Sequence, residues 1–402
     1  MTKPTDVRMT GPLTGYARDF CDELAAKHYT PLSAANQLRV MAHLSRWLAG
    51  EGVDPRELSA HQVDRFLHAR RRAGYTCWLS VRGLTPLLAY LRRLEVVPQP
   101  ASRSPSTPVD RLVDEYAAYL RHERALADTS IRFRQEVARA FLSATTGDGL
   151  ALRRLTGQRV TQYMLGAFRG YSVGSAGLLA TGVRSLLRFL HLRGHISALL
   201  MGAVPKIAGW RLTSLPRVVE PEHVERLLDH CDRRTAVGRR DYAILLLLVR
   251  LGLRAGEVAA LRLEDIDWRL GEIVIHGKGG REDRMPLPAD VGDALAAYLR
   301  RGRPSCEGRT VFVGSRAPHR ALTSAAVSSR VVWASIGAGL AQRIAAHRLR
   351  HTAATAMLRR GSSLDDIAQV LRHRSTATTA IYAKVDRDSL RSLARAWPGG
   401  AP

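Results

Sequence analysis

Several residues between positions 250 and 385 have the chemistry needed to bind a phosphate and to transfer a proton. Arg254 follows Gly252, which ends an apolar helix, and stands just before the next predicted helix. A guanidinium beside a helix N-terminus binds phosphate well, because its fork of N–H donors and the helix dipole both favour an anion. His347 and Arg350 are spaced i, i+3 and therefore share one face of a helix. These segments predict an anion-binding site.

Lys278 lies at the tip of a predicted β-hairpin. The strand-like segments 272–276 and 282–287 are joined by Gly277-Lys278-Gly279-Gly280, and glycines clustered in one turn are typical of a hairpin tip. Only five of the 61 lysines and arginines are lysines, so this position keeps an ammonium where the chain elsewhere uses arginine. An ammonium can give up a proton, whereas a guanidinium effectively cannot. Lys278 is therefore a candidate for proton transfer.

A further segment ends in a tyrosine. His373 is followed by Ser375 and Thr376, either of which can cap a helix that presents Tyr382 about two turns later. Each residue taken alone has a structural interpretation: a solvated arginine, a capping histidine or a core tyrosine. The order and spacing of two arginines, two histidines, one lysine and one tyrosine outweigh those interpretations and favour a catalytic constellation.

The elements around these residues are predicted to be mainly helical, with a small antiparallel sheet. A helix begins near Glu220-Pro221, and Arg240–Leu251 is apolar on most faces, as in a core helix. Thr310–Val313 is a candidate third strand beside the hairpin, and further helices run to about Arg395. These elements define a predicted domain over 213–395.

The sequence ahead of this domain contains an internal repeat. Residues 10–98 and 109–204 both show helical periodicity and are separated by a Pro/Ser-rich linker at 99–108. The matched positions are Leu58 with Leu155, Val63 with Val160, Gly83 with Gly182, Leu87 with Leu186, Tyr90 with Phe189, and Val97 with Ile196. We therefore expect two related helical domains, the first of which carries the basic run Arg70-Arg71-Arg72.

The charge of the 402-residue chain points to a polyanionic partner. Lysine and arginine total 61 against 36 acids, which gives a formal net charge of +25 and a pI near 11.0. Genome composition explains a preference for arginine over lysine, but it does not explain the excess of bases over acids. Nucleic acid is the expected partner.

Several other classes of protein are not indicated. No uncharged apolar run approaches the ~18 residues that a membrane span needs, and the N-terminus lacks an apolar signal core, so we expect a cytoplasmic protein. The four cysteines form no CxxC pair, so neither a zinc cluster nor a disulfide framework is predicted. Gly170-Tyr-Ser172-Val-Gly174 matches a hydrolase nucleophile elbow but follows a helix rather than a strand. We expect Ser172, and Thr76 in the first repeat, to be helix N-caps instead.

The motifs of 213–390 together resemble the catalytic domain of the tyrosine recombinase (phage integrase) family. The anchors are Gly252-Leu-Arg254-x-x-Glu257, His347-x-Leu-Arg350-His351-Thr352-x-x-Thr355, and Leu371-x-His373-x-Ser375 ahead of Tyr382. The resemblance implies that Tyr382 is the nucleophile, that Arg254 and Arg350 clamp the phosphate, and that Lys278 is the general acid. It also implies that His347 and His373 assist proton transfer and bind phosphate, without a metal or other cofactor.

The resemblance also suggests roles for the remaining parts of the chain. Residues 109–204 fit the helical core-binding domain of the family, and 10–98 is an addition that simpler members lack. Arg372 stands where the family usually has glycine; if the turn needs a positive φ, the substitution costs about 1 kcal/mol. Arg372 is also a candidate contact to the DNA backbone.

The sequence therefore predicts a multidomain site-specific DNA recombinase, an integrase or a transposase. The resemblance implies that it acts on double-stranded DNA through a 3′-phosphotyrosine intermediate and forms a homotetramer at synapsis. Two alternatives remain: a type IB topoisomerase-like relaxase, and a catalytically silent DNA-binding factor.

Overall fold

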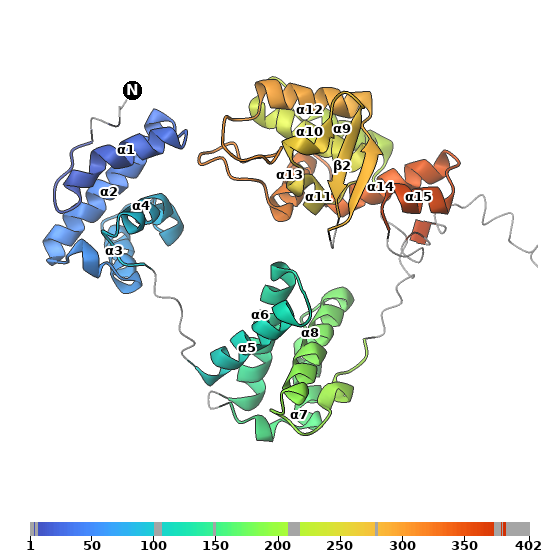
Figure 1. The fold of residues 1–402 in the computed structure, drawn as a ribbon, viewed down its shortest axis with the longest axis horizontal. Coiled ribbons are helices and arrows are strands. Elements are labelled where there is room, and N and C mark those ends of the chain that lie inside the picture. The colour runs from blue at the N-terminus through green and yellow to red at the C-terminus, as the bar shows by residue number, and fades with distance from the viewer. Residues whose placement is uncertain are drawn as a thin grey trace, which may run out of the picture. The chain divides into compact units, whose positions relative to one another are not determined.

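The structure, a computed structural model, describes residues 4, 7–99, 107–147, 150–207, 218–277, 280–373, 379, 381 and 382. The described chain is mainly helical, with one small three-stranded antiparallel sheet, so the predicted fold class is confirmed (Figure 1). Residues 99–213 form one compact unit and the rest of the chain forms the other. The second unit contains three separate apolar clusters among its described residues, one within 13–97, one within 219–349 and a small one within 354–382. We refer to 7–99, 107–207 and 218–382 as the N-terminal, middle and C-terminal bodies.

The N-terminal body consists of four helices. They are α1 (Ala17–Ala26), α2 (Pro31–Glu51), α3 (Ala60–Arg72) and α4 (Val81–Arg93), with 3₁₀ turns at Thr14–Tyr16 and Pro55–Glu57. Local sequence sets the ends of α2, because the Thr30 side chain accepts from the Ser33 N–H and Gly52 adopts the left-handed conformation that terminates a helix. Apolar faces of the four helices meet in one core.

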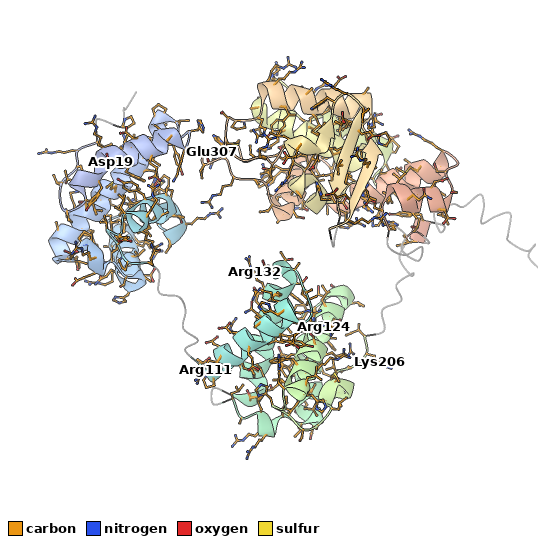
Figure 2. The ribbon with its side chains drawn as sticks, viewed as in Figure 1. Asp19, Arg111, Arg124, Arg132, Lys206 and Glu307 are labelled. Atoms are coloured by element: carbon orange, nitrogen blue, oxygen red, sulfur yellow. The ribbon has the colours of Figure 1, made fainter. Side chains whose placement is uncertain are left out.

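The middle body repeats this order of helices. It contains α5 (Pro108–His122), α6 (Asp128–Thr146), α7 (Gly157–Phe168) and α8 (Val173–Leu192), with 3₁₀ turns at Leu152–Arg154 and Leu200–Ala203. Thr107 caps α5 ahead of Pro108, as the preference for proline in the first helical turn predicts. Its surface carries arginines; Figure 2 labels three that are exposed, Arg111, Arg124 and Arg132.

The two bodies match in their cores and differ at one helix. Leu87 and its repeat partner Leu186 are both fully buried, in α4 and α8. However, α4 has 13 residues and α8 has 20, because α4 lacks the first turns of its counterpart. Trp78 has a φ of +59° just before α4, a conformation that a helix cannot contain.

Because α4 starts later in its repeat than α8, only one of the two N-cap predictions is confirmed. Ser172 caps α8 and accepts from the Ser175 N–H, as expected. The prediction for Thr76 is wrong, since α4 begins at Val81 with Ser80 as its N-cap. Two arginines of the basic run hold the segment between α3 and α4: Arg70 donates to the Cys77 carbonyl and Arg71 to the Leu79 carbonyl.

The C-terminal body is built around one buried helix. Its elements are α9 (Pro221–Asp229), α10 (Ala236–Arg250), α11 (Ala255–Ala260), β1 (Ile266–Asp267), β2 (Glu272–His276), β3 (Glu282–Pro286), α12 (Ala289–Arg301), α13 (Ser324–Gly337), α14 (Ala346–Arg359) and α15 (Leu364–Val370), with a 3₁₀ turn at Leu263–Asp265. The apolar residues 243–248 of α10 are at most 2% exposed, which confirms the predicted core helix. The helices α9, α12 and α14 pack around it.

The sheet has the order β1-β2-β3, and β2 pairs with β3 from Glu272↔Pro286 to His276↔Glu282. The predicted hairpin is therefore present, although its tip residues Lys278 and Gly279 lie outside the described residues. The prediction of a third strand at Thr310–Val313 is wrong. The backbone of this buried segment pairs with two separate loops, through the Leu261 carbonyl and the Leu322 N–H, and β1 takes the third place in the sheet.

Candidate active site

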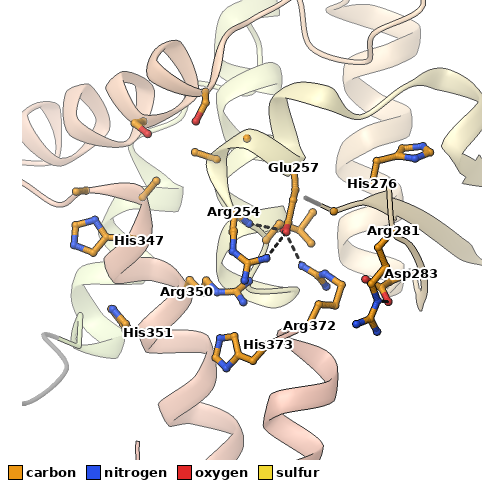
Figure 3. Close-up of a pocket in the computed structure, with 18 of the residues that line it drawn as sticks. Arg254, Glu257, His276, Arg281, Asp283, His347, Arg350, His351, Arg372 and His373 are labelled. Carbon is orange, nitrogen blue, oxygen red and sulfur yellow. Dashed lines mark hydrogen bonds and ion pairs between the residues drawn. The ribbon is translucent and has the colours of Figure 1, made fainter. Parts of the chain in front are cut away.

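A cavity of about 960 Å³ in the C-terminal body is lined by most of the residues that the sequence singled out. It lies between the start of α11, the β2–β3 hairpin, α14 and the segment after α15 (Figure 3). The predicted site residues that line it are Arg254, His347, Arg350, His373 and Tyr382. Lys278 and the candidate caps Ser375 and Thr376 lie outside the described residues, but Gly277 lines the cavity directly before Lys278.

Arg254 is held at the N-terminus of α11 by Glu257. The Arg254 backbone N–H donates to Oε2 of Glu257 at 2.8 Å, and Nη1 donates to Oε1 at 2.6 Å. The Arg254 side chain is 47% exposed, so the guanidinium keeps open access to the cavity that it lines. This geometry places the Arg254 guanidinium at the start of α11, where the sequence predicts a phosphate clamp.

Glu257 is buried and has a second cationic partner, Arg372. Nη2 of Arg372 donates to Oε2 of Glu257 at 2.7 Å, and both side chains are nearly inaccessible to solvent. Burial opposes ionisation of Glu257, but the hydrogen bond from the Arg254 N–H and the charge of Arg372 outweigh it and lower the pKa. Glu257 is thus a carboxylate at neutral pH.

Arg350 lies deeper in the cavity wall and is only 7% exposed. It donates to the carbonyl of Gly252 at 2.5 Å and to the carbonyl of Leu371. Gly252 has a φ of +58°, and a Cβ there would lie 2.6 Å from Cδ2 of Leu371, so this approach requires glycine. Burial, and then the charge of Arg254, lowers the pKa of Arg350 to about 10, which leaves it protonated at neutral pH.

Tyr382 faces His351 at the cavity wall. The tyrosine is 1% exposed, and its Oη lies 2.8 Å from Nδ1 of His351. Burial raises the pKa of Tyr382, although the charges of Arg350 and Arg254 oppose the rise. Burial, followed by the charges of His347 and Arg350, lowers the pKa of His351. A neutral His351 ring can therefore accept a hydrogen bond from the tyrosine hydroxyl.

The two predicted histidines lie on either side of this pair. The His373 ring is nearly parallel to Tyr382, with centroids 6.4 Å apart, and its Nδ1 lies 2.7 Å from Oγ1 of Thr379. Burial, followed by the charges of Arg350 and Arg254, lowers the pKa of His373 to about 4, so it is neutral at neutral pH. His347 is exposed, and its ring centroid lies 6.0 Å from that of His351.

The turn that carries Arg372 has a positive φ, as is typical of a position where the family usually has glycine. Arg372 has a φ of +55°, which costs a side chain about 1 kcal/mol. The suggestion that Arg372 contacts the DNA backbone does not fit the structure. The residue is 7% exposed and its guanidinium is directed into the protein toward Glu257.

Comparisons with known proteins show the family of this chain. Residues 217–388 match the model of the phage integrase family. A protein of Sinorhizobium fredii (strain NBRC 101917 / NGR234) named "Putative integrase/recombinase y4rA" is 39% identical over 396 residues, which are 97% of this chain and 96% of the relative. The chain belongs to the tyrosine recombinase (phage integrase) family. Tyrosine recombinase XerC of Shewanella amazonensis (strain ATCC BAA-1098 / SB2B) is 30% identical over 72% of this chain and 95% of its own.

The fold of this tyrosine recombinase is shared with a solved structure. A lambda integrase tetramer bound to a Holliday junction matches with a TM-score of 0.53 and 17% identity, over 69% of this chain and 80% of that one. The predictions of the family and of a tyrosine-type site-specific recombinase are confirmed. The relaxase and silent-factor alternatives are not favoured.

Two residues of the recombinase site have contacts that the motif alone did not reveal. His351 and Glu257 appeared in the sequence motifs but were assigned no role. His351 lies one helical turn after His347, and this i, i+4 spacing is a signal that could have placed it on the cavity face of α14. Glu257 sits at the N3 position of α11, where an acidic side chain reaches back to the helix start.

The end of strand β2 is also held by a contact between two side chains. Nε2 of His276 lies 2.7 Å from Oδ1 of Asp265, which is buried at the end of the 3₁₀ turn before β1. The Gly277 N–H donates to the Arg281 carbonyl at 2.7 Å and closes the strand pairing just below the tip. These contacts fix the end of β2 and Gly277, directly before Lys278 in the sequence.

Proposed function

We propose that this recombinase breaks and rejoins double-stranded DNA through a 3′-phosphotyrosine formed at Tyr382, as an integrase or a transposase. The observation that carries the proposal is the position of the Tyr382 hydroxyl in the wall of a cavity that Arg254 and Arg350 also line. A nucleophile and two fixed guanidinium groups around one cavity suit attack on a phosphodiester.

The two arginines stabilise the negative charge that develops on the phosphate in the transition state. Both are held by protein acceptors before DNA binds, Arg254 by Glu257 and Arg350 by the Gly252 and Leu371 carbonyls. Preorganised donors need little rearrangement during the reaction, so they stabilise the transition state more than mobile ones.

Proton transfer accompanies each strand exchange. Oη of Tyr382 attacks phosphorus, its proton passes to a nearby base, and the bond to the 5′-oxygen breaks. His351 is the nearest described base, at 2.8 Å from the hydroxyl. His347 and His373 support the transfer and bind phosphate, and Lys278 protonates the leaving 5′-oxygen. The covalent phosphotyrosine retains the bond energy for rejoining, so ATP is not needed.

The remaining parts of the chain are assigned to DNA and subunit contacts. We assign 213–395 to the catalytic domain, 109–204 to the core-binding domain, and 10–98 to a further DNA-binding copy of that domain. The net charge of +25 supports a duplex DNA partner. The fold shared with a lambda integrase tetramer supports a homotetramer at synapsis.

The proposed site of action is the cytoplasm. None of the helices within the described ranges has both the length and the apolar character needed to cross a membrane.

The decisive experiment captures the covalent intermediate. Nicked duplexes with a randomised central sequence are incubated with the protein, and SDS-stable adducts are isolated and sequenced to define the cleavage site. We expect Tyr382→Phe to bind the selected duplex but to form no adduct. Tyr298→Phe is the matched control, because Tyr298 is also 1% exposed in the C-terminal body but does not line the cavity. An adduct with Tyr382→Phe, or none with the native protein, contradicts the proposal.

A further inference from the structure

Arg372 combines two features that are each unfavourable for an arginine. Its φ of +55° lies in the region that side chains other than glycine rarely adopt. Its side chain is also 4% exposed, although arginine is almost never buried unless it is paired. A glycine would meet neither difficulty. The contacts of the guanidinium therefore indicate what the residue contributes.

These contacts join three separate segments at the edge of the cavity. Nη2 donates to Oε2 of Glu257 in α11 at 2.7 Å. Nη1 donates to the Val370 carbonyl at 2.9 Å and lies 2.6 Å from Sδ of Met285 in β3. One guanidinium thus links the start of α11, the hairpin that carries Lys278, and the turn that precedes His373.

The carboxylate of Glu257 that accepts from Arg372 also accepts from Arg254. Oε1 of Glu257 accepts from the Arg254 side chain, while Oε2 accepts from the Arg254 backbone and from Arg372. Because both oxygens are engaged from opposite sides, the carboxylate cannot rotate without losing a charged hydrogen bond. Figure 3 shows Arg254 and Arg372 converging on this one carboxylate. The guanidinium of Arg254 is therefore held in one orientation at the cavity.

We propose that Arg372 is a positioning residue, which fixes Glu257 and through it the orientation of the Arg254 guanidinium. It also ties strand β3 of the hairpin to the same point. This inference rests on the proposed role of Arg254 as a phosphate clamp. Arg372 also lines the cavity, but its guanidinium is buried and directed to Glu257, Val370 and Met285, so we assign it a positioning role rather than a contact with DNA.

The first test separates positioning from binding. Single-turnover adduct formation and equilibrium affinity are measured on the nicked duplex selected above, for the native protein, Arg372→Gly and Arg372→Lys. We expect Arg372→Gly to cleave about 10²-fold more slowly at saturating protein, as a small misplacement of a reacting group does. The Kd for the duplex should stay within a few fold of the native value. Arg372→Lys should recover part of the rate, because an ammonium can still reach Glu257.

A matched control excludes a general effect of disturbing a buried ion pair. Arg240 is 4% exposed, pairs with Asp241 in the same body, and does not line the cavity. Arg240→Lys should lose some thermal stability and keep the native cleavage rate. Glycine adopts a positive φ without strain, so Arg372→Gly should fold. Its melting temperature is measured to verify that the protein tested is folded.

A double-mutant cycle tests whether Arg372 acts through Glu257. If it does, adding Arg372→Gly to Glu257→Gln should slow cleavage little beyond Glu257→Gln alone. Full additivity of the two losses would overturn the proposal, as would native-like cleavage by Arg372→Gly. A parallel loss of affinity and rate would instead make Arg372 a DNA ligand. The absence of any adduct with the native protein would refute the proposed function rather than this inference.

Discussion

The C-terminal body and the two helical bodies differ in how many charged side chains they bury. In the C-terminal body the described residues include five buried charged side chains: Arg240, Glu257, Asp265, Arg350 and Arg372. Within the described parts of the N-terminal and middle bodies, Arg70 is the one buried charge, and the cores are otherwise apolar apart from four uncharged polar residues. The helical bodies carry their other charges at or near the surface.

This difference separates stability from catalysis. Burying a charge costs free energy unless it is paired and hydrogen-bonded, so apolar packing is the easier way to stabilise a fold. Three of the five buried charges, Glu257, Arg350 and Arg372, line the cavity, where Arg350 can act on a phosphate and the other two can hold Arg254 in place. Substitutions of the cavity residues should therefore change the rate of cleavage, whereas those in the helical bodies should change DNA binding or stability.

The largest effect is expected at the two arginines of the cavity. Arg254→Ala and Arg350→Ala should each reduce the cleavage rate by about 10²–10³-fold, since each removes a preorganised donor, while DNA affinity changes little. The measurement is adduct formation under single-turnover conditions, compared with equilibrium binding to the same duplex. Equal losses of binding and cleavage would indicate that these arginines only anchor DNA.

The two arginine variants should also differ in thermal stability. Arg350 is buried and hydrogen-bonds two carbonyls, whereas the Arg254 side chain is 47% exposed. Arg350→Ala should therefore lower the melting temperature more than Arg254→Ala, because it leaves buried acceptors unpaired. Equal melting temperatures would show that burial of Arg350 contributes nothing to the fold.

A strong effect, which a modified DNA substrate should reverse, is expected from substitution of Lys278. Lys278→Ala should slow cleavage of normal DNA, because the leaving 5′-oxygen then lacks a proton donor. A substrate with a bridging 5′-sulfur at the scissile position should restore much of the rate, since sulfur leaves without protonation. Lys278→Arg should also be slow, because arginine does not release its proton. If the sulfur substrate fails to rescue Lys278→Ala, the lysine only binds phosphate.

A smaller effect, confined to binding, is expected when the N-terminal body is removed. A shortened protein that begins near Thr107 should keep the catalytic centre and bind DNA more weakly. For each ion pair with a phosphate that the truncation removes, the slope of log affinity against log salt should fall by about 0.9. Arg70 is buried and Arg71 is hydrogen-bonded to the Leu79 carbonyl, so these ion pairs should come from other exposed arginines of the body.

Salt titrations of the full-length and shortened proteins test this assignment, together with an assay that pairs two DNA sites. The competing hypothesis is that 10–98 docks on a neighbouring subunit. In that case the slope on a single site would be unchanged and only pairing would fail.

The smallest effect on cleavage is expected from matched substitutions in the cores of the repeats. Leu87→Ala and Leu186→Ala each remove a side chain that is fully buried at equivalent positions. Each should lower the stability of its own body by about 2–5 kcal/mol and leave the cleavage rate of bound DNA unchanged. Hydrogen exchange followed by mass spectrometry should show reduced protection in 7–99 for the first variant and in 107–207 for the second. Reduced protection in both bodies would show that they unfold together.

The sequence alone determined the parts of this protein that depend on contiguous residues. The helix start at Ser172 followed from its local capping group, and the hairpin from its strands and glycines. The helical repeat followed from matched apolar positions, and His347 and Arg350 were placed on one face by their i, i+3 spacing, because such side chains share a helix face whatever the rest of the chain does. The roles of the site residues came from the resemblance to the family. The predictions that were wrong concern short sequence patterns that fit more than one local structure. Thr310–Val313 is apolar enough for a strand but pairs with loops, and Thr76 resembles a cap but precedes a residue with positive φ.

The tertiary structure decided which of these residues act on one another. The pairs Arg372–Glu257, Arg350–Gly252 and His351–Tyr382 are separated by 115, 98 and 31 positions. No periodicity links residues so far apart, since their contact depends on how α10, α11, α14 and the hairpin pack. For the same reason the sequence suggested DNA as the partner of Arg372, a charged residue on a basic chain. Only the folded structure shows that its charge is directed inward, to a carboxylate that holds another arginine in place.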